Sequence, residues 1–180
     1  MPIIDAEKGH ELIFTVRTSK VQKHKGEISF PGGAFEADSD NSLEETAVRE
    51  AREEINLSPD QITILGELDD FCTMTGYIIH PVVAHVAPPY EYKIETTEVA
   101  EVFTVPLEFF KDPAHFEEKI MPIGDWQYAV YYFRPGTHTI WGATAHIVVN
   151  FFEMALKFPM PATLRKRPSP EQILALKGKF

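Results

Sequence analysis

Hydrophobic positions fall in short runs along most of the chain, and turn residues separate these runs. Runs of this length are typical of strands, whereas helices need ten or more residues. The pattern therefore predicts a sheet built from several short strands. We expect strands at Glu11–Arg17, Glu27–Phe30, Ile62–Leu68, Ile78–Val86, Ala100–Val105, Trp126–Arg134 and Thr137–Trp141.

Helices are expected in three places. Leu43–Ile55 and Ala143–Phe158 have helical length, and Pro159 ends the second stretch. Asp112 and Pro113 have the residue types of an N-cap and a first helical position, which predicts a short helix between strands. Strands and helices thus mix without a regular alternation, which favours an α+β or a layered α/β/α architecture with a mixed sheet.

The first predicted helix has local signals at both ends. Phe30-Pro31-Gly32-Gly33 predicts a turn directly after a strand. Ser42 and Glu45 have the spacing of a capping box, in which two side chains satisfy backbone N–H groups at the start of a helix. Asn56 tolerates the left-handed conformation that ends many helices. The segment is therefore predicted to be a strand, a glycine loop and a capped helix.

Three glutamates, Glu50, Glu53 and Glu54, are spaced i, i+3 and i+4 along this helix and share one of its faces. Like charges at this spacing destabilise a helix by about a few tenths of a kcal/mol per pair. One interpretation is a solvated acidic face. The other is a site for a hard cation such as Mg²⁺, which takes oxygen ligands. The glycine loop and the capped start of the helix favour the metal site.

This segment resembles the signature of the Nudix hydrolases, which is Gly, five residues, Glu, seven residues and Arg-Glu-U-x-Glu-Glu-x-Gly-U, where U is apolar. Arg49-Glu50-Ala51-x-Glu53-Glu54-x-Asn56-Leu57 matches the second half except at Asn56. In the first half, Gly33 lies two residues early and Asn41 stands where the signature has Glu. Asp40 is the expected substitute carboxylate.

The resemblance implies a mixed sheet between helices and hydrolysis of a diphosphate that is linked to another group. It also implies Mg²⁺ or Mn²⁺ as the cofactor, with Glu50 and Glu54 as metal ligands. Glu53 is then either a third metal ligand or the base for the attacking water.

Other roles follow from the same resemblance. Arg49 is expected to hold one glutamate through a bidentate pair. Gly32 and Gly33 are expected to turn the backbone toward the metal or a phosphate. Glu98 and Glu101 are rival candidates for the base, because some Nudix enzymes take the base from a loop outside the helix.

Cations concentrate just before the glycine loop, in a chain whose net charge is −10. Such a cluster suits an anionic substrate that carries a phosphate away from the metal. A basic loop that keeps a hairpin soluble is the alternative. The candidate substrate-binding residues here are Arg17, Lys20, Lys23, His24 and Lys25.

The same stretch resembles the second signature of the coenzyme A pyrophosphatase branch of the Nudix hydrolases. That signature is roughly Leu-Leu-Thr-x-Arg-Ser, three residues, Arg, three residues, Gly, three residues and Phe-Pro-Gly-Gly. Gln22 stands at the second arginine, where it keeps hydrogen bonding but loses the charge. The resemblance continues to about Lys157. The matches in register are Ile13, Phe14, Thr15, Arg17, Thr18, Gly26 and Phe30–Gly33.

The leading hypothesis is a metal-dependent hydrolase that splits coenzyme A or its thioesters into 3′,5′-ADP and 4′-phosphopantetheine or the acyl form. Because of Gln22, hydrolysis of another nucleoside diphosphate derivative, such as ADP-ribose, NADH or a dinucleotide, is the first alternative. Asn41 supports a second alternative, a weakly catalytic domain that binds a nucleotide and regulates.

Composition limits the partners and the compartment. The net charge of −10 argues against binding to nucleic acid or to anionic membranes. No apolar stretch reaches the roughly 18 residues of a membrane span. Cys72 is the only cysteine, which excludes an internal disulfide and suits the reducing cytoplasm. We expect its thiol to be buried and inert.

The length of 180 residues fits one domain, which we expect over residues 1–158, followed by a tail over residues 159–180 with a short amphipathic helix from Pro170. The chain starts inside its first expected strand, at residues 1–4. We expect that strand to have a weakly protected edge, which a homodimer would cover. Tyr77 and Trp141 are candidate aromatics of a ligand pocket, with a core role as the alternative.

Overall fold

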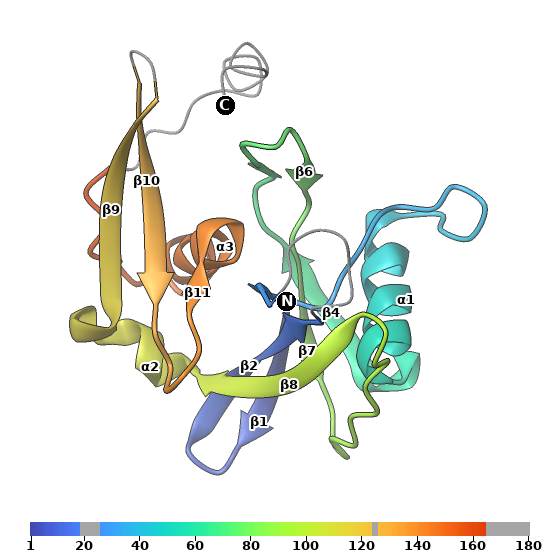
Figure 1. The fold of residues 1–180 in the computed structure, drawn as a ribbon. Helices are drawn as coiled ribbons and strands as arrows, with labels where there is room; N and C mark the ends of the chain where they lie inside the picture. Colours follow the sequence, from blue (N-terminus) through green and yellow to red (C-terminus); the bar gives the residue numbers. More distant parts are fainter. Residues whose placement is uncertain (19–25, 124–125, 165–180) are drawn as a thin grey trace. The chain divides into compact units, whose positions relative to one another are not determined.

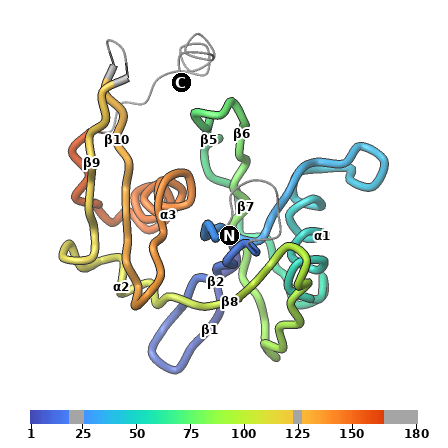
Figure 2. Tube along the Cα trace, viewed as in Figure 1, coloured from blue at the N-terminus to red at the C-terminus, as the bar shows by residue number. Residues whose placement is uncertain are grey.

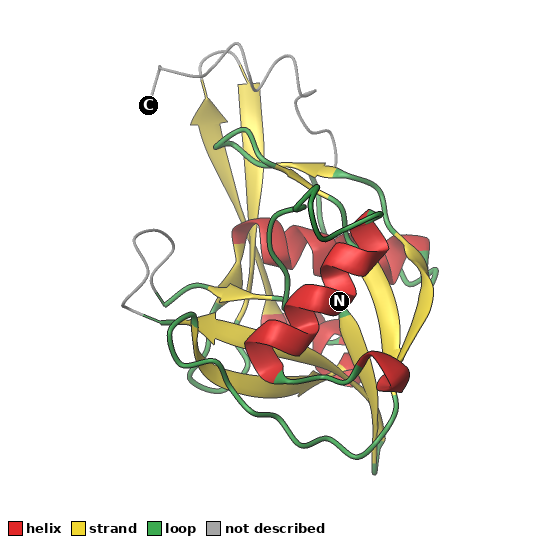
Figure 3. Ribbon diagram, turned by 90° about the vertical axis from the view of Figure 1, so that its right-hand side faces the viewer, coloured by secondary structure: helices red, strands yellow, loops and turns green. Residues whose placement is uncertain are grey.

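The computed structural model describes residues 1–18, 26–123 and 126–164. The chain divides into two compact units, one of Met1–Glu67 and Val82–Phe109, the other of Leu68–Pro81 and Phe110–Phe180. Strands and helices occur together in the described residues (Figure 1, Figure 3). The expected α+β architecture is therefore confirmed.

The first unit is built around a mixed sheet. Its strands in the described residues are β1 (Pro2–Ala6), β2 (Gly9–Arg17), β3 (Ile28–Ser29), β4 (Ile62–Glu67), β7 (Val82–Val86) and β8 (Val99–Pro106). The strand order is β3-β2-β1-β7-β4, and β8 also pairs with β2. β1 and β7 run parallel, whereas the other pairs are antiparallel, so the predicted mixed sheet is confirmed.

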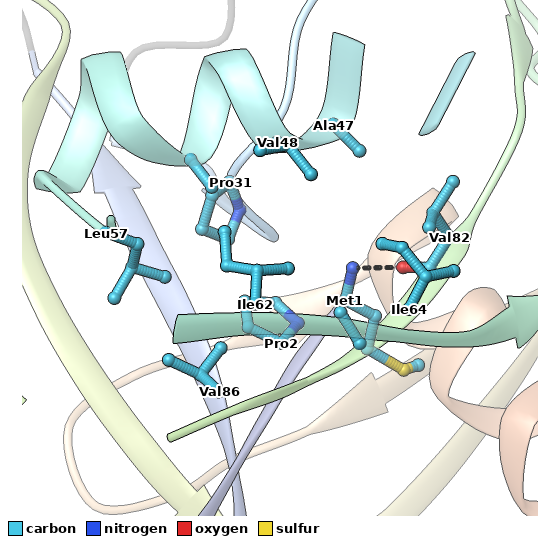
Figure 4. A pocket seen from close by; sticks show the side chains of 12 residues that line it. Met1, Pro2, Pro31, Ala47, Val48, Leu57, Ile62, Ile64, Val82 and Val86 are labelled. Carbon is cyan, nitrogen blue, oxygen red and sulfur yellow. Dashed lines mark hydrogen bonds between the residues drawn. The ribbon is translucent and has the colours of Figure 1, made fainter. Parts of the chain in front are cut away.

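The first strand lies inside this sheet, and the expectation of a weakly protected edge was wrong. β1 pairs with β2 over residues 3–6 and with β7 over residues 2–4. The amino group of Met1 donates to the carbonyl of Val82 at 2.6 Å (Figure 4). Because both backbone edges of β1 are paired, this strand gives no reason to expect a homodimer.

Helix α1 (Leu43–Ile55) begins and ends where the local signals predict. The N–H of Glu45 donates to Ser42 Oγ at 3.2 Å, but the Glu45 carboxylate accepts from the N–H of Asn41 instead of Ser42. Only one half of the capping box therefore forms. Asn56 takes φ 61° and ψ 32°, the left-handed conformation that was expected at the end of the helix.

The apolar face of α1 packs on the sheet of the first unit. Ala51 and Ile55 belong to the same buried cluster as Ile13 of β2, Val86 of β7 and Val99 of β8. Contact with three different strands fixes the rotation of the helix about its axis, because residues three and four apart lie on one face. The acidic residues between these apolar positions are therefore held at a defined angle.

A small apolar cavity lies beside α1 in the first unit. Its walls come from α1, from β1, β4 and β7, and from Pro31, which directly precedes the glycine pair (Figure 4). The lining side chains carry no charge and no polar group. The cavity therefore offers nothing that could bind a phosphate or a metal.

The second unit contains two smaller sheets. β5 (Phe71–Cys72) and β6 (Ile78–Ile79) form a short hairpin. β9 (Phe116–Ile123), β10 (Trp126–Phe133) and β11 (Ile140–Trp141) form a sheet in the order β11-β10-β9, and α3 (Gly142–Met154) packs on β10 and β11 (Figure 2). Shorter elements elsewhere are η1 (Pro59–Gln61), α2 (Leu107–Lys111) and η2 (Pro113–His115).

Several element boundaries differ from the prediction. The expected strand at Ile78–Val86 is divided into β6 and β7, since residues 80–81 are not in a strand. Helix α3 ends at Met154, because Lys157 takes φ 53° and the N–H of Phe158 donates back to the carbonyl of Phe152 at 2.9 Å. β11 is shorter than expected, and β5, β9 and α2 were not predicted.

Residues 159–164 are bound to the second unit. The Glu118 carboxylate accepts from the N–H groups of Thr163 and Leu164, both at 2.9 Å, and Met160 and Ala162 are buried. Residues 165–180, which include the helix expected from Pro170, lie outside the described residues. The division into a domain over 1–158 and a tail over 159–180 stays a prediction.

Candidate functional site

Helix α1 places two of its three glutamates in a sheltered environment and leaves the third exposed. The side chain of Glu50 is 13% exposed and that of Glu53 is 58% exposed, whereas Glu54 is buried. Glu50 and Glu54 are four residues apart and therefore neighbours on the helix surface. The helix thus presents a sheltered pair of carboxylates, with Glu53 at its margin.

The glycine loop lies against this pair. A Cβ added to Gly33 would be 2.3 Å from Glu50 Oε1 and 2.5 Å from its Cδ, distances that real Cβ contacts do not show. The N–H of Gly32 donates to Glu54 Oε2 at 3.2 Å. The close approach gives a physical reason for glycine at position 33, because any side chain there would displace the Glu50 carboxylate.

Arg49 joins the helix to the loop that precedes it. Its Nε and Nη2 donate to the two carboxylate oxygens of Asp40 at 2.8 and 2.9 Å. Its Nη1 donates to Glu50 Oε1 at 2.9 Å and to Glu53 Oε2 at 3.1 Å. The bidentate partner is therefore Asp40, and the expectation of a bidentate pair with a glutamate was wrong. Glu50 and Glu53 instead each accept one hydrogen bond from Nη1.

Asp40 is buried and uses both oxygens as acceptors. In addition to Arg49, the hydroxyl of Thr46 and the N–H of Glu36 donate to Oδ2 at 2.9 and 3.0 Å. The Arg49 hydrogen bonds, followed by those of Glu36 and Thr46, hold the pKa of Asp40 well below its usual range. Asp40 is therefore a structural acid that orients Arg49, and its oxygens are not available to a metal.

Asn41 has a different role. Its backbone N–H and its Nδ2 donate to Glu45 Oε2 at 2.9 and 2.7 Å, and these bonds lower the pKa of Glu45. Asn41 thus stabilises the start of α1, while the neighbouring Asp40 supplies the carboxylate. The structure therefore gives a reason why the carboxylate stands at position 40, one residue before the position of the signature glutamate.

Arg17 at the end of β2 and Glu98 directly before β8 are close enough for their charges to act on Glu54. β2 and β8 pair with an irregularity between Val16 and Arg17, and the N–H of Thr18 donates to the carbonyl of Glu98 at 2.9 Å. Such irregularities redirect a side chain relative to the regular pleat. Within the described residues, Arg17 Nε is buried and has no hydrogen-bond partner. Its N–H is therefore an unsatisfied buried donor in the part of the chain that the structure describes.

The segment before Glu98 is bound to the end of α1. The N–H of Lys93 donates to the carbonyl of Ile55 at 3.3 Å, and the N–H of Glu95 donates to the carbonyl of Glu54 at 2.9 Å. These bonds position Glu98 beside the helix acids. Sequence reasoning missed this role of Lys93 and Glu95, because backbone hydrogen bonds leave no trace in the side-chain pattern. It also missed Thr46, whose hydroxyl supports Asp40.

The environment of the pair disfavours its negative charge. Burial raises the pKa of Glu54 to about 7, and burial also raises the pKa of Glu50. The charges of Glu50 and Glu98 raise the pKa of Glu54 further, whereas the N–H of Gly32 and the charge of Arg17 lower it. A cation bound here would offset this excess of negative charge.

The donor set fits a hard divalent cation. Within the ranges that the structure describes, no three His, Cys, Asp or Glu side chains are arranged to hold a metal ion together. Mg²⁺ does not need three, since proteins usually bind it through one or two carboxylates together with water and substrate phosphates. Glu50 and Glu54 provide such a pair. Glu53 lies at the margin of this pair, because its carboxylate is 58% exposed whereas those of Glu50 and Glu54 are sheltered.

The remaining candidates lie in several places. Lys20, Gln22, Lys23, His24 and Lys25 lie outside the described residues. Phe30 stacks on the buried Phe14 with ring centroids 4.7 Å apart, which supports a core role. Glu101 is exposed on β8. Cys72 and Tyr77 belong to the second unit, where Cys72 is half-buried and Tyr77 is exposed.

Trp141 is an exposed residue of β11 in the second unit, whereas the glutamate pair lies in the first. No helix in the described part of the chain is long and apolar enough to cross a membrane.

The fold is similar to that of solved Nudix proteins. A MutT/nudix family protein from Enterococcus faecalis matches with a TM-score of 0.52 and 14% identity, over 98% of this chain and 64% of that chain. An Ap4A hydrolase from C. elegans matches with a TM-score of 0.51 and 17% identity, over 59% of this chain and 76% of that chain. Both likenesses concern the fold alone.

Sequence comparison identifies the family. The NUDIX domain matches residues 1–124. The uncharacterized Nudix hydrolase NudL of Photorhabdus laumondii is 32% identical over 82% of this chain and 78% of its own length. NudL of Citrobacter koseri is 35% identical over 76% of this chain and 71% of its own length. The chain therefore belongs to the Nudix family of hydrolases.

Proposed function

We propose that the protein hydrolyses the diphosphate bond of coenzyme A or its thioesters in a reaction that depends on Mg²⁺ or Mn²⁺. Water adds an oxygen to one phosphorus, and the bridging oxygen leaves with the other, which gives 3′,5′-ADP and 4′-phosphopantetheine or its acyl form. The observation that carries the proposal is the sheltered pair of Glu50 and Glu54 against the glycine loop, with the unpartnered Nε of Arg17 nearby.

Glu50 and Glu54 would hold the metal ion. When bound, the metal would activate water and offset the charge that develops on the phosphates. Arg49 is the positioning residue of this pair, because it binds Glu50 and is itself oriented by Asp40. A second glutamate, Glu53, is held by the same arginine at the exposed margin of the site.

The chain's other residues would handle the proton and the substrate. Glu98 is exposed and close enough to raise the pKa of both Glu50 and Glu54, so its carboxylate can accept a proton from water in the same space. Glu53 is the alternative base. The guanidinium of Arg17 would bind a phosphate oxygen through its free N–H.

The choice of coenzyme A rests on the segment that joins β2 to the glycine loop. Arg17, Thr18, Gly26 and Phe30–Gly33 match the coenzyme A pyrophosphatase branch in register. Arg17 of this segment supports the choice, because its Nε has no hydrogen-bond partner within the described residues and its charge acts on Glu54. Positive charge in this segment would suit the additional 3′-phosphate of coenzyme A.

A turnover panel with product identification tests the proposal. Coenzyme A, dephospho-coenzyme A, ADP-ribose and NADH are incubated with the protein and Mg²⁺ or Mn²⁺, with the variant Glu54→Gln as the control. We expect 3′,5′-ADP and 4′-phosphopantetheine, and a preference for coenzyme A over its dephospho form. A preference for ADP-ribose or NADH would replace coenzyme A with another nucleoside diphosphate derivative. Tight coenzyme A binding without product would indicate a regulatory domain.

A further inference from the structure

The three-stranded sheet of the second unit carries aromatic and cationic side chains on one face. Tyr132 of β10 and Trp141 of β11 are direct partners across the two strands. Their rings are nearly parallel, with an angle of 9° between the planes and 6.2 Å between the centroids. Lys119 Nζ lies 4.9 Å and Arg134 Cζ lies 5.5 Å from the centre of the Tyr132 ring. We call these four residues the aromatic–cationic surface.

This surface lies opposite the face that α3 covers. Tyr131 and Phe133 of β10 are buried, and successive side chains of a strand point to opposite faces of its sheet. Tyr132 therefore points away from the buried face, and its partner Trp141 is 43% exposed. A tryptophan exposed to this extent leaves a large part of its indole ring available for contact with another planar group.

Stabilisation of the sheet does not account for all of these features. An aromatic pair across two strands stabilises a sheet, and cations near an aromatic ring add to that effect. Neither the aromatic pair nor the contact between cation and ring requires an exposed tryptophan. Glu117 pairs with both Lys119 and Arg134, so the local groups still carry one excess positive charge in a chain of net charge −10. The surface combines planar rings with positive charge.

We propose that the aromatic–cationic surface binds a nucleotide, with the base stacked on Trp141 and a phosphate near Lys119 and Arg134. Stacking on an aromatic side chain accepts any base, because every base has a π-face. The arginine and lysine side chains supply the positive charge that attracts the phosphate. The nucleotide comes from the pool of free nucleotides and binds wholly within this unit.

Calorimetric titration with 3′,5′-ADP in the absence of divalent metal tests this proposal independently of hydrolysis. We expect binding to the wild-type protein that weakens at least about fivefold in Trp141→Leu, given the usual strength of base stacking. Trp141→Phe should retain most of the affinity. Lys119→Gln should weaken binding and reduce its dependence on salt.

Matched variants test whether the nucleotide binds at this surface or elsewhere on the protein. Tyr77→Leu removes an exposed aromatic residue of the same unit that lies outside the surface, and it should bind like the wild type. Glu54→Gln should also bind normally, which distinguishes this surface from the proposed hydrolytic site. Absence of binding to the wild type, or equal affinity of Trp141→Leu and Tyr77→Leu, would overturn the proposal.

Discussion

Glu54 combines a buried carboxylate with surroundings that oppose its negative charge. Loss of a residue that merely supports a metal ligand costs about 10–100-fold in activity. We therefore expect Glu54→Gln to lower metal-dependent turnover by more than about 100-fold. The amide keeps an acceptor for the N–H of Gly32, so the fold should persist. Steady-state turnover and far-UV circular dichroism measure the two effects.

A matched control lies on the same helix. Glu44 is exposed in the first turn of α1, away from the glycine loop. Glu44→Gln removes the same charge and should leave turnover within about twofold, as expected for a surface substitution of small effect. Wild-type activity of Glu54→Gln at saturating Mg²⁺ would remove Glu54 from the metal site.

Asp40 predicts a dependence of stability on pH. Its pKa is lowered in the folded protein, chiefly by the Arg49 hydrogen bonds, so the unfolded state binds a proton more readily. The resulting stabilisation is fully present above the unfolded pKa of about 3.9 and is lost as the pH falls below it. In urea unfolding between pH 5 and pH 2, the wild type should lose stability more steeply than Asp40→Asn.

The two proteins should therefore converge at low pH. The variant already lacks the carboxylate that binds Arg49 through two hydrogen bonds, so it should be the less stable protein at pH 5 and approach the wild type toward pH 2. Parallel curves over the whole range would show that Asp40 does not contribute through its charge.

At the scale of elements, the glycine loop and α1 depend on each other. In Gly33→Ala, the new Cβ would overlap Glu50 Oε1, so either the loop or the carboxylate must move. We expect turnover to fall by roughly tenfold or more, comparable to the loss of a supporting contact. Kinetic measurement of kcat/KM in Gly33→Ala, in Glu50→Ala and in the double variant forms a cycle.

The cycle has a defined outcome. If Gly33→Ala acts only by displacing the Glu50 carboxylate, the double variant should be no less active than Glu50→Ala, because the affected group is already absent. Additive losses would instead mean that the alanine disturbs the loop by another route.

The left-handed conformation at the end of α1 predicts that alanine and glycine at position 56 have different effects on stability. Asn56 takes φ 61°, a conformation that costs most residues with a Cβ about 1 kcal/mol, whereas glycine adopts it freely and asparagine tolerates it because its short polar side chain can hydrogen-bond locally. Asn56→Ala should lower the free energy of unfolding by about 1 kcal/mol. Asn56→Gly, which restores the residue of the Nudix signature, should leave it unchanged or slightly higher. Denaturant unfolding of the pair provides the comparison, and equal values would contradict the cap.

Elements with local signals were predicted from the sequence, and elements that depend on partners were not. The start and end of α1 follow from Ser42 and Asn56, which act on their own helix. β9 was missed because Phe116–Ile123 begins with Phe116 and three charged residues in a row and contains a proline, so the alternation typical of a strand is absent and only pairing with β10 makes it a strand. β1 was misjudged because its neighbours, β2 and β7, are set by the whole sheet.

The candidate site also contains residues that the sequence predicts and contacts that depend on distant parts of the chain. Glu50, Glu53 and Glu54 could be named as candidate metal ligands from spacing, since helix geometry converts spacing into a shared face. Asp40 could be named from the resemblance to the Nudix signature. The bidentate pair of Asp40 and Arg49 could not, because it depends on how the loop over residues 34–40 folds back to the helix. The approach of Glu98 depends on pairing between β2 and β8, which joins residues about 80 positions apart.

At the scale of the whole molecule, metal binding should be visible as stability without any substrate. Glu50, Glu54 and Glu98 repel one another in the metal-free protein, and the chain as a whole carries a net charge of −10. A ligand at 100 times its Kd stabilises the folded state by about 2.7 kcal/mol. For a chain of this size, Mg²⁺ or Mn²⁺ should therefore raise Tm by roughly 5–10 °C.

Thermal unfolding after chelation with EDTA, followed by addition of the metal, separates this effect from general screening of charge. An equal ionic strength of NaCl should give a much smaller rise in Tm, because monovalent ions screen exposed charges without binding the sheltered pair. Glu44→Gln should keep the metal-dependent rise, whereas Glu54→Gln should lose most of it. An equal rise in both variants would place the metal elsewhere on the acidic surface. Only a metal bound at the Glu50–Glu54 pair should make Glu54→Gln differ from Glu44→Gln.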